Sequence, residues 1–453
     1  MNLQGKKVLV FGSGKSGIGA AELLGQVGAE PVIYDGNADL DKEAVVHKVK
    51  HCKDIRVYAG ELPQEVRKAL DLVVLSPGVP TDIPIVKSFY EQGLPVWGEV
   101  ELAYRTGKGR VLAITGTNGK TTTTALLGKI MGDAEESVFV VGNIGTPYTS
   151  KALEMQDNTT TVAEISSFQL ETTRYFKPVV SAILNITPDH MNRHHTMDNY
   201  SMAKAKIFAN QDESGYCIIN GDDEICCRLA ENCRAKVRMF SLEKELQDGA
   251  FLKDGTLVIA DGGQVTELCR RDELKIIGRH NIQNALAAAA ISFYAGIPAP
   301  VIREGLINFG GVEHRIEYCG SVDGVKYYND SKATNVDAAV TAIEAIGKDI
   351  ILIAGGDGKG QDFTDLIKNF RGRVKHLILL GRDGPLIGAA ADKEGYGDHE
   401  SCPNMEECVK RAAQMADSGD TVLLSPACAS WDMYDNFEQR GRHFKEIVAR
   451  LSK

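Results

Sequence analysis

The segment ITGTNGKTTTT, residues 114–124, contains residue types that can hold the phosphates of a nucleotide. The usual phosphate-binding loop has a glycine six residues before its lysine, but Ile114 stands at that position. What remains is Gly116-Thr117-Asn118-Gly119-Lys120-Thr121, between the strand-like RVLAI and the helix-like TTTTALLGKIMG. In that context backbone N–H groups converge on an anion, Lys120 can reach the β- and γ-phosphate oxygens, and the Thr121 hydroxyl can ligate Mg²⁺. The alternative is a tight strand–helix turn capped by a threonine.

A second glycine-rich segment, FGSGKSG, follows the first strand-like run and has the form Gly12-x-Gly14-x-x-Gly17. Asp35 ends the second such run, close to the spacing of a dinucleotide-binding fingerprint. The segment Ser76-Pro77-Gly78 is expected at the carboxyl end of the same sheet. Three interpretations stay open: an NAD site, a site for another nucleotide, and a close helix–strand crossing without a ligand.

Two further segments contain possible metal ligands. In AEISSFQLE, Glu164 ends a β-branched run, where its carboxylate could ligate Mg²⁺ or could simply be exposed. In NITPDHMNRHH, His190 could join one Mg²⁺ or orient a substrate, while His194 and His195 are expected on the surface. A zinc site is not favoured, because no other Cys or His spacing completes a set of four ligands.

The segment YSMAKAKIF has Lys204 and Lys206 two residues apart. On a helix they point to different sides, so that one can face a site while the other is solvated. In GRHNIQNALAA, Asn281 and Asn284 lie one helical turn apart, where amides can read a base edge, although Asn281 could instead cap the helix.

The last third of the chain has three more segments with binding residues at expected strand ends, where functional loops commonly lie. They are YYNDSKATN with Asp330, Lys332 and Thr334, AGGDGKGQDF with Lys359, and SPACASWDMYDNF with Ser430 and Phe437.

The elements that must position these residues form three consecutive α/β blocks, with breaks near residues 98 and 311. In each block, short β-branched runs that end in Gly, Ser or Asp alternate with helical stretches, which predicts mainly parallel sheets covered by helices. A length of 453 residues agrees with about three domains.

Composition limits the classes of partner. The net charge of −10 argues against nucleic acid as a partner, because binding it requires basic surface. No stretch of about 18 apolar residues suggests a membrane span, and the N-terminus has no signal-peptide pattern. The 10 cysteines have no C-x-x-C spacing, which is typical of reduced thiols. We therefore expect a soluble, cytoplasmic protein.

Several of these motifs occur together and in order along nearly the whole chain: G-T-N-G-K-T-T, AEISSFQLE, PDHM, YSMAKAKIF, GRHNIQNALAA, EHRIE, NDSKATN and SPACASWDMYDNFEQRG. The combination resembles the Mur ligases, the ATP-dependent enzymes that add amino acids in bacterial peptidoglycan synthesis. FGSGKSG, NDSKATN and the last motif resemble in particular the member that adds D-glutamate. The D-N-P-R-like motif of the diaminopimelate- or lysine-adding member is absent.

The resemblance implies an α/β fold of three domains: a Rossmann-like UDP-binding domain (1–98), a central P-loop-type ATPase domain with a mainly parallel sheet (99–311) and a C-terminal Rossmann-like, amino-acid-binding domain (312–453). It also implies the reaction. ATP phosphorylates the terminal alanyl carboxylate of UDP-N-acetylmuramoyl-L-alanine, and the D-glutamate amine attacks the acyl phosphate. Two Mg²⁺ ions are expected, with Mn²⁺ as a possible substitute, and the protein is expected to be a monomer.

Residue roles follow from matching positions in the family motifs. Lys120, Glu164, His190 and Lys204 are expected to be catalytic, and the metal-site residues would be Thr121, Glu164, His190 and Lys204, the last of them carbamylated by CO₂. ATP would contact Gly116, Thr117, Asn118, Gly119, Lys120, Thr121, Thr122, Asn281, Asn284, Arg315 and Asp330. The UDP-substrate would contact Gly14, Lys15, Ser16, Asp35, Ser76, Gly78, Asn143 and Ser166. D-Glutamate would contact Lys332, Thr334, Lys359, Ser430 and Phe437.

Three rival functions can be stated. A nicotinamide-dependent dehydrogenase would use FGSGKSG but leaves Lys204 and NDSKATN unexplained. Folylpolyglutamate synthetase also adds glutamate through an acyl phosphate, but it lacks the N-terminal UDP domain. A non-enzymatic ATP-binding regulator is disfavoured, because Lys120, Glu164, His190 and Lys204 are all present.

Overall fold

The computed structural model describes residues 2–52, 54–143 and 145–451. They form two compact units, residues 1–273 with 283–307 and residues 274–282 with 308–453. The first unit contains two sheets and the second unit contains one. Each unit is described by itself below.

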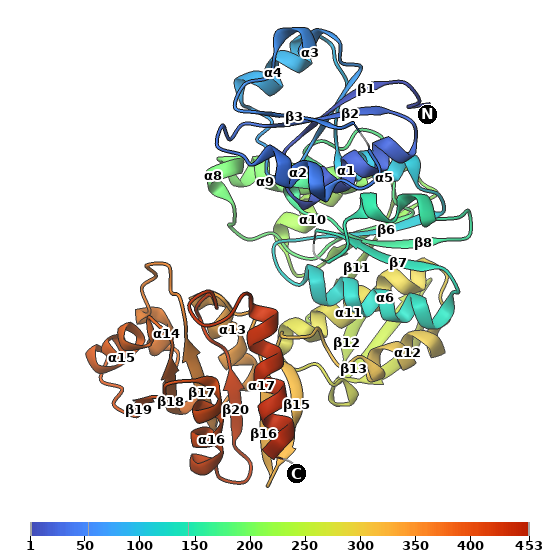
Figure 1. Ribbon diagram of the computed structural model, residues 1–453. Helices are drawn as coiled ribbons and strands as arrows, with labels where there is room; N and C mark the ends of the chain where they lie inside the picture. The colour runs from blue at the N-terminus through green and yellow to red at the C-terminus, as the bar shows by residue number, and fades with distance from the viewer. Residues whose placement is uncertain (1, 53, 144, 452–453) are drawn as a thin grey trace. The chain divides into compact units, whose positions relative to one another are not determined.

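The first sheet has five parallel strands in the order β3-β2-β1-β4-β5. Figure 1 labels β1, β2 and β3 of this sheet. Its strands are β1 (Lys7–Phe11), β2 (Glu30–Asp35), β3 (Arg56–Ala59), β4 (Leu72–Leu75) and β5 (Val96–Gly98), and its helices are α1 (Lys15–Gln26), α2 (Lys42–Lys48), α3 (Gln64–Lys68), α4 (Pro84–Glu91) and α5 (Glu99–Thr106). Alternate residues of β1 enter different apolar clusters, Val8 and Val10 on one face and Leu9 and Phe11 on the other. Both faces are therefore covered, as a parallel sheet requires.

The second sheet has nine strands in the order β14-β13-β12-β11-β10-β9-β6-β8-β7. They are β6 (Arg110–Thr115), β7 (Val138–Gly142), β8 (Thr160–Glu164), β9 (Val180–Ile183), β10 (Tyr216–Asn220), β11 (Lys236–Ser241), β12 (Gly249–Lys253), β13 (Thr256–Asp261) and β14 (Gln264–Arg270). The strands from β7 to β12 pair in parallel, and β12, β13 and β14 form antiparallel hairpins. Because β6 lies between β8 and β9, the segment after it lies beside the ends of two other strands.

The helices that follow these strands are α6 (Lys120–Ala134), α7 (Ser167–Leu170), α8 (Met191–His194), α9 (Met197–Ala205), α10 (Glu224–Ala230), α11 (Arg279–Tyr294) and α12 (Ala299–Asn308). Short 3₁₀ turns cover Tyr148–Ser150, Ala152–Glu154, Lys206–Phe208 and Arg271–Glu273. The residues from Ala285 to Ile291 of the alanine-rich α11 are all fully buried, which explains why this helix is apolar on every side.

The sheet of the second unit has the order β15-β16-β20-β17-β18-β19, with only β15 antiparallel to its neighbour. Its strands are β15 (Glu317–Val322), β16 (Val325–Asn329), β17 (Ile350–Gly355), β18 (Val374–Leu380), β19 (His399–Ser401) and β20 (Thr421–Leu424), and its helices are α13 (Val336–Ile346), α14 (Thr364–Lys368), α15 (Gly384–Lys393), α16 (Met405–Met415) and α17 (Phe437–Leu451). In Figure 1, α17, in red, runs beside β15 and β16. All six residues of β17 are buried, because helices cover both faces of this sheet.

The prediction of α/β blocks with mainly parallel sheets is confirmed. The strands β12 and β13 form an antiparallel hairpin. Asp254 and Gly255 form the turn of this hairpin with φ of 48° and 79°. A two-residue hairpin turn favours positive φ at both of its residues. The boundaries after residues 98 and 311 stay predictions. All 10 cysteines are free thiols. No helix in the described part of the chain is long and apolar enough to cross a membrane.

Candidate functional site

The phosphate-loop candidate connects β6 to α6, with Gly119 as the residue before the helix. Gly119 has φ of 83°, and a Cβ there would lie 2.3 Å from Asn284 Oδ1. Only glycine fits this conformation and this approach. The start of α6 follows this turn, so the backbone N–H groups of its first turn lie at the positive end of the helix dipole. Thr121 is half-buried and Thr122 is buried in this first turn.

Two lysines converge on this loop. Lys120 Nζ donates to Gly116 O and Thr117 O, both at 2.8 Å, and Lys204 Nζ donates to the same Gly116 O at 2.8 Å. Lys204 is 2% exposed, and burial, reinforced by the charge of Lys120, lowers its pKa to about 7. Lys206 is exposed, so the two lysines of YSMAKAKIF point to different sides, as their spacing predicts. The loop therefore has two amino groups beside one carbonyl.

Neighbouring residues brace the loop. The Tyr200 hydroxyl lies 3.0 Å from Thr117 Oγ1, and Lys204 Nζ lies 4.6 Å from the centre of the Tyr200 ring. The segment after β9 contributes Asn185, whose carbonyl accepts from Thr117 N–H at 2.9 Å and whose side chain accepts from Asn118 N–H at 2.8 Å. These contacts hold the loop in place, and the Asn284 side chain lies close to Gly119 in the same loop.

Glu164, the last residue of β8, is 2% exposed, so the alternative of an exposed strand-end glutamate is wrong. Its Oε1 accepts from Asn143 Nδ2 at 3.1 Å, and its carbonyl accepts from Asn143 N–H at 2.8 Å. A buried carboxylate held by an amide is an oxygen donor of the kind that Mg²⁺ prefers. Ser166 follows two residues later and caps α7.

His190 is exposed and has a left-handed backbone with φ of 54°, and its ring centre lies 4.8 Å from that of Phe168. Its Nε2 lies 3.4 Å from Asp189 Oδ2. Within the described ranges, no group of three or more His, Cys, Asp or Glu side chains could hold a metal ion. Of the four expected metal-site residues, only Glu164 and His190 have one of these four side-chain types. A metal site that includes them would therefore need metal-ligating atoms from other groups as well.

The expectation that His194 lies on the surface is wrong. His194 is 4% exposed, with Nε2 3.0 Å from Ser167 Oγ and Nδ1 3.5 Å from Glu171 Oε1. Its ring also contacts the rings of Phe168 and Tyr200. Burial lowers the pKa of His194, so the neutral form is favoured. A histidine can be buried when both ring nitrogens find partners, and sequence alone does not show those partners.

The N-terminal glycine-rich turn is held by Asp35. Asp35 Oδ2 accepts from Ser13 N–H at 3.0 Å and from the Ser13 hydroxyl at 2.6 Å, while Oδ1 accepts from Asn37 N–H at 3.0 Å. Burial raises the pKa of Asp35, but these hydrogen bonds outweigh it and the pKa is lowered. A Cβ on Gly17 would lie 1.9 Å from Gly12 O, which is the close helix–strand crossing expected of this motif.

Five other UDP-substrate candidates lie on this turn or on the strand-end segment beside it: Gly14, Lys15, Ser16, Ser76 and Gly78. Ser76 Oγ donates to Gly12 O at 3.4 Å, which places the SPG segment against the turn. Gly14 and Lys15 are exposed, and Lys15 Nζ donates to Gly145 O at 2.6 Å, close in sequence to Asn143. Ser16 is half-buried in the first turn of α1 and Gly78 is exposed.

In the second unit, Asp330 follows β16 and is 4% exposed. Its Oδ2 accepts from the Ser425 hydroxyl at 2.7 Å and its Oδ1 from Ile316 N–H at 3.2 Å. Burial raises the pKa of Asp330 to about 7, although these hydrogen bonds and the charge of Arg315 oppose the shift. Asn281 lies in the first turn of α11 and donates to Ile277 O at 2.7 Å.

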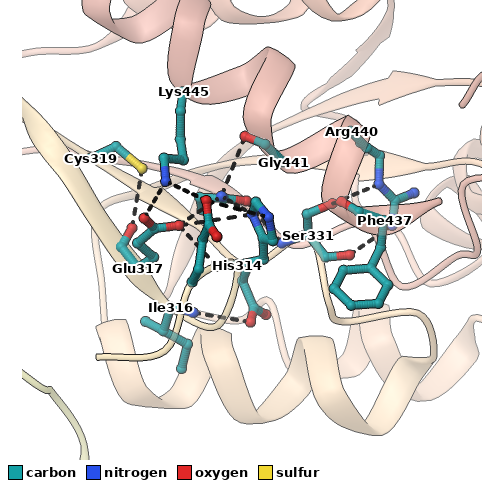
Figure 2. Close-up of polar contacts among 12 residues, drawn as sticks. His314, Ile316, Glu317, Cys319, Ser331, Phe437, Arg440, Gly441 and Lys445 are labelled. Carbon is teal, nitrogen blue, oxygen red and sulfur yellow. Dashed lines mark hydrogen bonds and ion pairs between the residues drawn. The ribbon is translucent and has the colours of Figure 1, made fainter. Parts of the chain in front are cut away.

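Four of the five expected D-glutamate residues lie on segments tied together by one buried arginine: Lys332 and Thr334 after β16, Ser430 after β20, and Phe437 at the start of α17. Figure 2 shows Arg440 beside Ser331 and Phe437. Arg440 donates to Ser331 Oγ at 3.0 Å, Ser331 O at 2.8 Å, Cys428 O at 3.0 Å and Ala429 O at 3.3 Å. The Ser331 hydroxyl in turn donates to Phe437 O at 2.8 Å. The loop after β16, the loop after β20 and the start of α17 are therefore joined at one point.

Lys332 and Lys359 each face an aromatic ring. Lys332 Nζ lies 5.8 Å from the ring centre of Phe437, and Lys359 Nζ lies 4.6 Å from that of Trp431. Lys359 has φ of 53°, and its N–H donates to Asp357 Oδ1 at 3.0 Å. Ser430, next to Trp431, is 2% exposed. Thr334 is half-buried on the same loop as Lys332.

Sequence reasoning did not single out several residues of these two regions. Tyr200, Asn185, Ser425, Trp431 and Arg440 all contact expected site residues or their loops. Ser425 directly follows β20 and Asn185 comes two residues after the end of β9, and these strand-end positions could have identified them. A fully buried arginine has no such signal, because arginine is usually exposed.

Models of three domain families match the chain. The Mur ligase MurD-like N-terminal domain matches residues 6–98, the Mur ligase middle domain matches 114–292, and the Mur ligase glutamate ligase domain matches 314–428. The chain is 48% identical over 451 residues to a UDP-N-acetylmuramoylalanine–D-glutamate ligase from Lachnospira eligens, with 100% of both chains covered. It is 43% identical over 452 residues to a protein of the same name from Clostridioides difficile, again with 100% of both covered.

Solved structures with similar folds include a UDP-N-acetylmuramate-alanine ligase from Thermotoga maritima, with a TM-score of 0.60, 19% identity, and 98% of this chain and 99% of that chain covered. A pseudomurein peptide ligase type C from Methanothermus fervidus matches with a TM-score of 0.55 and 18% identity over 98% and 100% of the two chains. These likenesses show the three-domain fold. Together with the full-length relatives and the matched domains, they show that the chain belongs to the Mur ligase family.

Proposed function

We propose that this chain joins D-glutamate to the alanyl carboxylate of UDP-N-acetylmuramoyl-L-alanine, with ATP converted to ADP and phosphate. The observation that carries this proposal is the convergence of the Lys120 and Lys204 amino groups on Gly116 O, within a G-T-N-G-K-T loop. The names of the full-length relatives support the choice of substrates. The match of the N-terminal residues to a Mur ligase domain disfavours the two alternative enzymes, a nicotinamide-dependent dehydrogenase and folylpolyglutamate synthetase.

In the first step, an oxygen of the alanyl carboxylate attacks the γ-phosphorus of ATP and the bond to the β,γ-bridging oxygen breaks, releasing ADP. Both reacting groups are anions, so this step needs alignment and neutralisation of charge. The N–H groups at the start of α6 would hold the phosphates. The Lys120 ammonium group would stabilise the negative charge that develops on the γ-phosphate during transfer. Asn281, Asn284, Arg315 and Asp330 are proposed to contact the nucleotide.

The family implies Mg²⁺, and the residues present fit it in part. Glu164 supplies a buried carboxylate oxygen and Thr121 a hydroxyl at the head of α6, while nucleotide phosphates commonly complete such a site. Bound Mg²⁺ would neutralise phosphate charge. His190 and a modified Lys204 are proposed as donors for a second ion, and Mn²⁺ would suit the same ligands.

Lys204 is proposed to carry a carbamate. Burial and the neighbouring Lys120 lower the pKa of Lys204 to about 7, so a large fraction of this amine is neutral near neutral pH. A neutral amine can attack CO₂ and lose a proton, which converts the side chain to an anion. That anion would no longer repel Lys120, and it offers oxygen atoms where an ammonium offers none.

In the second step, the D-glutamate amine attacks the acyl carbon, loses a proton, and phosphate leaves as the carbon–oxygen bond breaks. Lys332, Thr334, Lys359, Ser430 and Phe437 are proposed to hold D-glutamate or the acyl phosphate. Two lysines suit a dicarboxylate, because each can pair with one carboxyl group.

The uridine diphosphate is proposed to lie on the N-terminal glycine-rich turn. Gly14 directly precedes α1, and Lys15 and Ser16 begin this helix, whose N-terminal dipole favours a phosphate. Asp35, Ser76 and Gly78 line the same strand ends, and Asn143 and Ser166 would face the sugar and its peptide. We further propose that the chain works as a cytoplasmic monomer, with peptidoglycan precursor synthesis as its role.

The test is phosphate release by the purified protein with ATP, UDP-N-acetylmuramoyl-L-alanine and D-glutamate. We expect release only when all three are present, and no release when L-glutamate replaces the D-isomer. Release with L-glutamate, or without the uridine substrate, would contradict the assignment. A change in absorbance with NADH or NADPH would favour the dehydrogenase alternative instead.

A further inference from the structure

The start of α5 has two buried glutamates that contact the segment after β8. Glu101 is fully buried and accepts backbone N–H groups of Arg174, Tyr175 and Phe176 at 2.9–3.1 Å. Glu99 is 5% exposed and makes a different contact: its Oε1 accepts from Gln169 Nε2 at 2.7 Å. Neither glutamate is among the expected site residues.

Gln169 connects Glu99 to Ser166. Gln169 Oε1 accepts from Ser166 N–H at 2.8 Å, and Ser166 Oγ accepts from Gln169 N–H at 3.3 Å, which forms a capping box. A side-chain amide can be turned over, which would exchange its donor and its acceptor. Because Gln169 Nε2 donates to Glu99 Oε1, Gln169 Oε1 is left to accept from the Ser166 N–H. The chain Glu99–Gln169–Ser166 therefore fixes one orientation.

This capping turn is next to the proposed chemistry. Ser166 lies two residues after Glu164, and Ile165 N–H between them donates to Ile114 O of β6 at 2.8 Å. A turn held at both ends keeps the side chains of its first residues in one geometry. The capping contacts between Gln169 and Ser166 are sufficient to stabilise the start of α7. The buried carboxylate of Glu99 is not needed for that stabilisation. Glu99 Oε2 has no hydrogen-bond partner in the described structure, so burying this group is costly.

We propose that Glu99 is a positioning residue for the ligase reaction: acting through Gln169, it holds Ser166 in place for the UDP-linked substrate. The inference rests on the proposed function of Ser166. Glu99 touches no reacting atom. Burial raises the pKa of Glu99 to about 7, so an uncharged amide is a close substitute for it.

The experiment compares four variants with the wild type. Glu99→Met removes the acceptor at similar volume. Glu99→Gln keeps an acceptor for Gln169, and the exchange variant Glu99→Gln/Gln169→Glu keeps the hydrogen bond with donor and acceptor reversed. Glu101→Gln is the matched control, because it alters a buried carboxylate on the same helix that has no contact with the capping box.

We expect Glu99→Met to raise the KM for the UDP-substrate by about fivefold or more, with the KM for ATP within about twofold of the wild type. Glu99→Gln and the exchange variant should stay within about twofold of the wild type for both substrates. Glu101→Gln should lower Tm without this selective rise in KM. If Glu99→Met shows no cooperative unfolding, Gln169→Met removes the same hydrogen bond together with the Gln169 contact to the Ser166 N–H, and it should show the same selective rise in the KM for the UDP-substrate.

Hydrogen exchange at the Ser166 amide gives a second measurement that needs no activity. We expect faster exchange in Glu99→Met and unchanged exchange in Glu99→Gln. An unchanged KM together with unchanged exchange in Glu99→Met would overturn the proposal, and so would an equal rise in KM in Glu101→Gln. If the wild type itself releases no phosphate, the proposed function fails, while the exchange measurement still decides whether Glu99 positions Ser166.

Discussion

Replacing Arg440 should destabilise the second unit and weaken D-glutamate binding together. Arg440 is 2% exposed, and burial lowers its pKa to about 10, so the guanidinium is still charged near neutral pH. It donates to three carbonyls and one hydroxyl from two loops. In Arg440→Met, the apolar part of the side chain stays but these buried acceptors lose their donors.

The magnitude follows from the number of acceptors. A buried acceptor left without a partner costs about 1–3 kcal/mol, but nearby groups relax and such costs do not add fully. Four neutral acceptors lose their donor in Arg440→Met, so we adopt about 3–5 kcal/mol, well below the full sum for four unsatisfied groups. For a unit of this size, such a loss corresponds to a fall in Tm of about 10 °C. Arg440→Lys should fall in between, because one amino group cannot reach all four acceptors.

Differential scanning calorimetry would measure the unfolding of each variant, and steady-state kinetics would give the KM for D-glutamate. We expect this KM to rise, because Arg440 and Ser331 tie the Phe437 end of α17 to the loop with Lys332 (Figure 2). The KM for ATP serves as the internal reference. A Tm of Arg440→Met within about 2 °C of the wild type would refute the reasoning.

Three further predictions follow from single residues. Lys204→Ala should lower kcat/KM by about 100-fold or more, whereas Lys206→Ala should stay within about twofold; the reverse order in a phosphate-release assay would contradict the assignment of Lys204. Gly119→Ala should raise the KM for ATP about tenfold, because its φ of 83° strains an alanine, whereas Gly132→Ala inside α6, with open space around its Cβ, should not. Burial raises the pKa of Asp330 from 3.8 to about 7, so the folded state holds a proton that the unfolded chain has lost between these values, and stability falls as pH rises through this window. Between pH 5 and pH 8, the free energy of unfolding, measured with denaturant, should fall by about 2–3 kcal/mol less in Asp330→Asn than in the wild type. An identical pH dependence of this free energy in both proteins would argue against a raised pKa.

The strands that could be predicted from sequence are those buried on both faces. β17, with the sequence IILIAG, is a continuous apolar run and was identifiable for that reason. The short strands β3 and β19 have no fully buried residue, and their sequences, RVYA and HES, have no period that indicates a strand. Only pairing with a neighbouring strand makes these segments extended.

The candidate site divides in a similar way. The spacing of Lys204 and Lys206 predicted that they lie on different sides of a helix, but not which side is buried. Packing of α9 decides that Lys204 is inside. His194 and Arg440 are of residue types that are usually exposed or half-exposed, and their burial depends on partners far away in the sequence. Motif matching therefore identified the loops of the candidate site, but it did not identify the buried residues that support these loops.

The central claim is that the alanyl carboxylate is phosphorylated by ATP before the amide forms. It is tested most directly with UDP-N-acetylmuramoyl-L-alanine labelled with ¹⁸O in both carboxyl oxygens, incubated with ATP, D-glutamate and the protein. Phosphorylation of the carboxylate predicts one labelled oxygen in every phosphate released, because the carbon–oxygen bond breaks when the amine attacks. Phosphate without label, formed alongside the D-glutamate amide, would contradict the account.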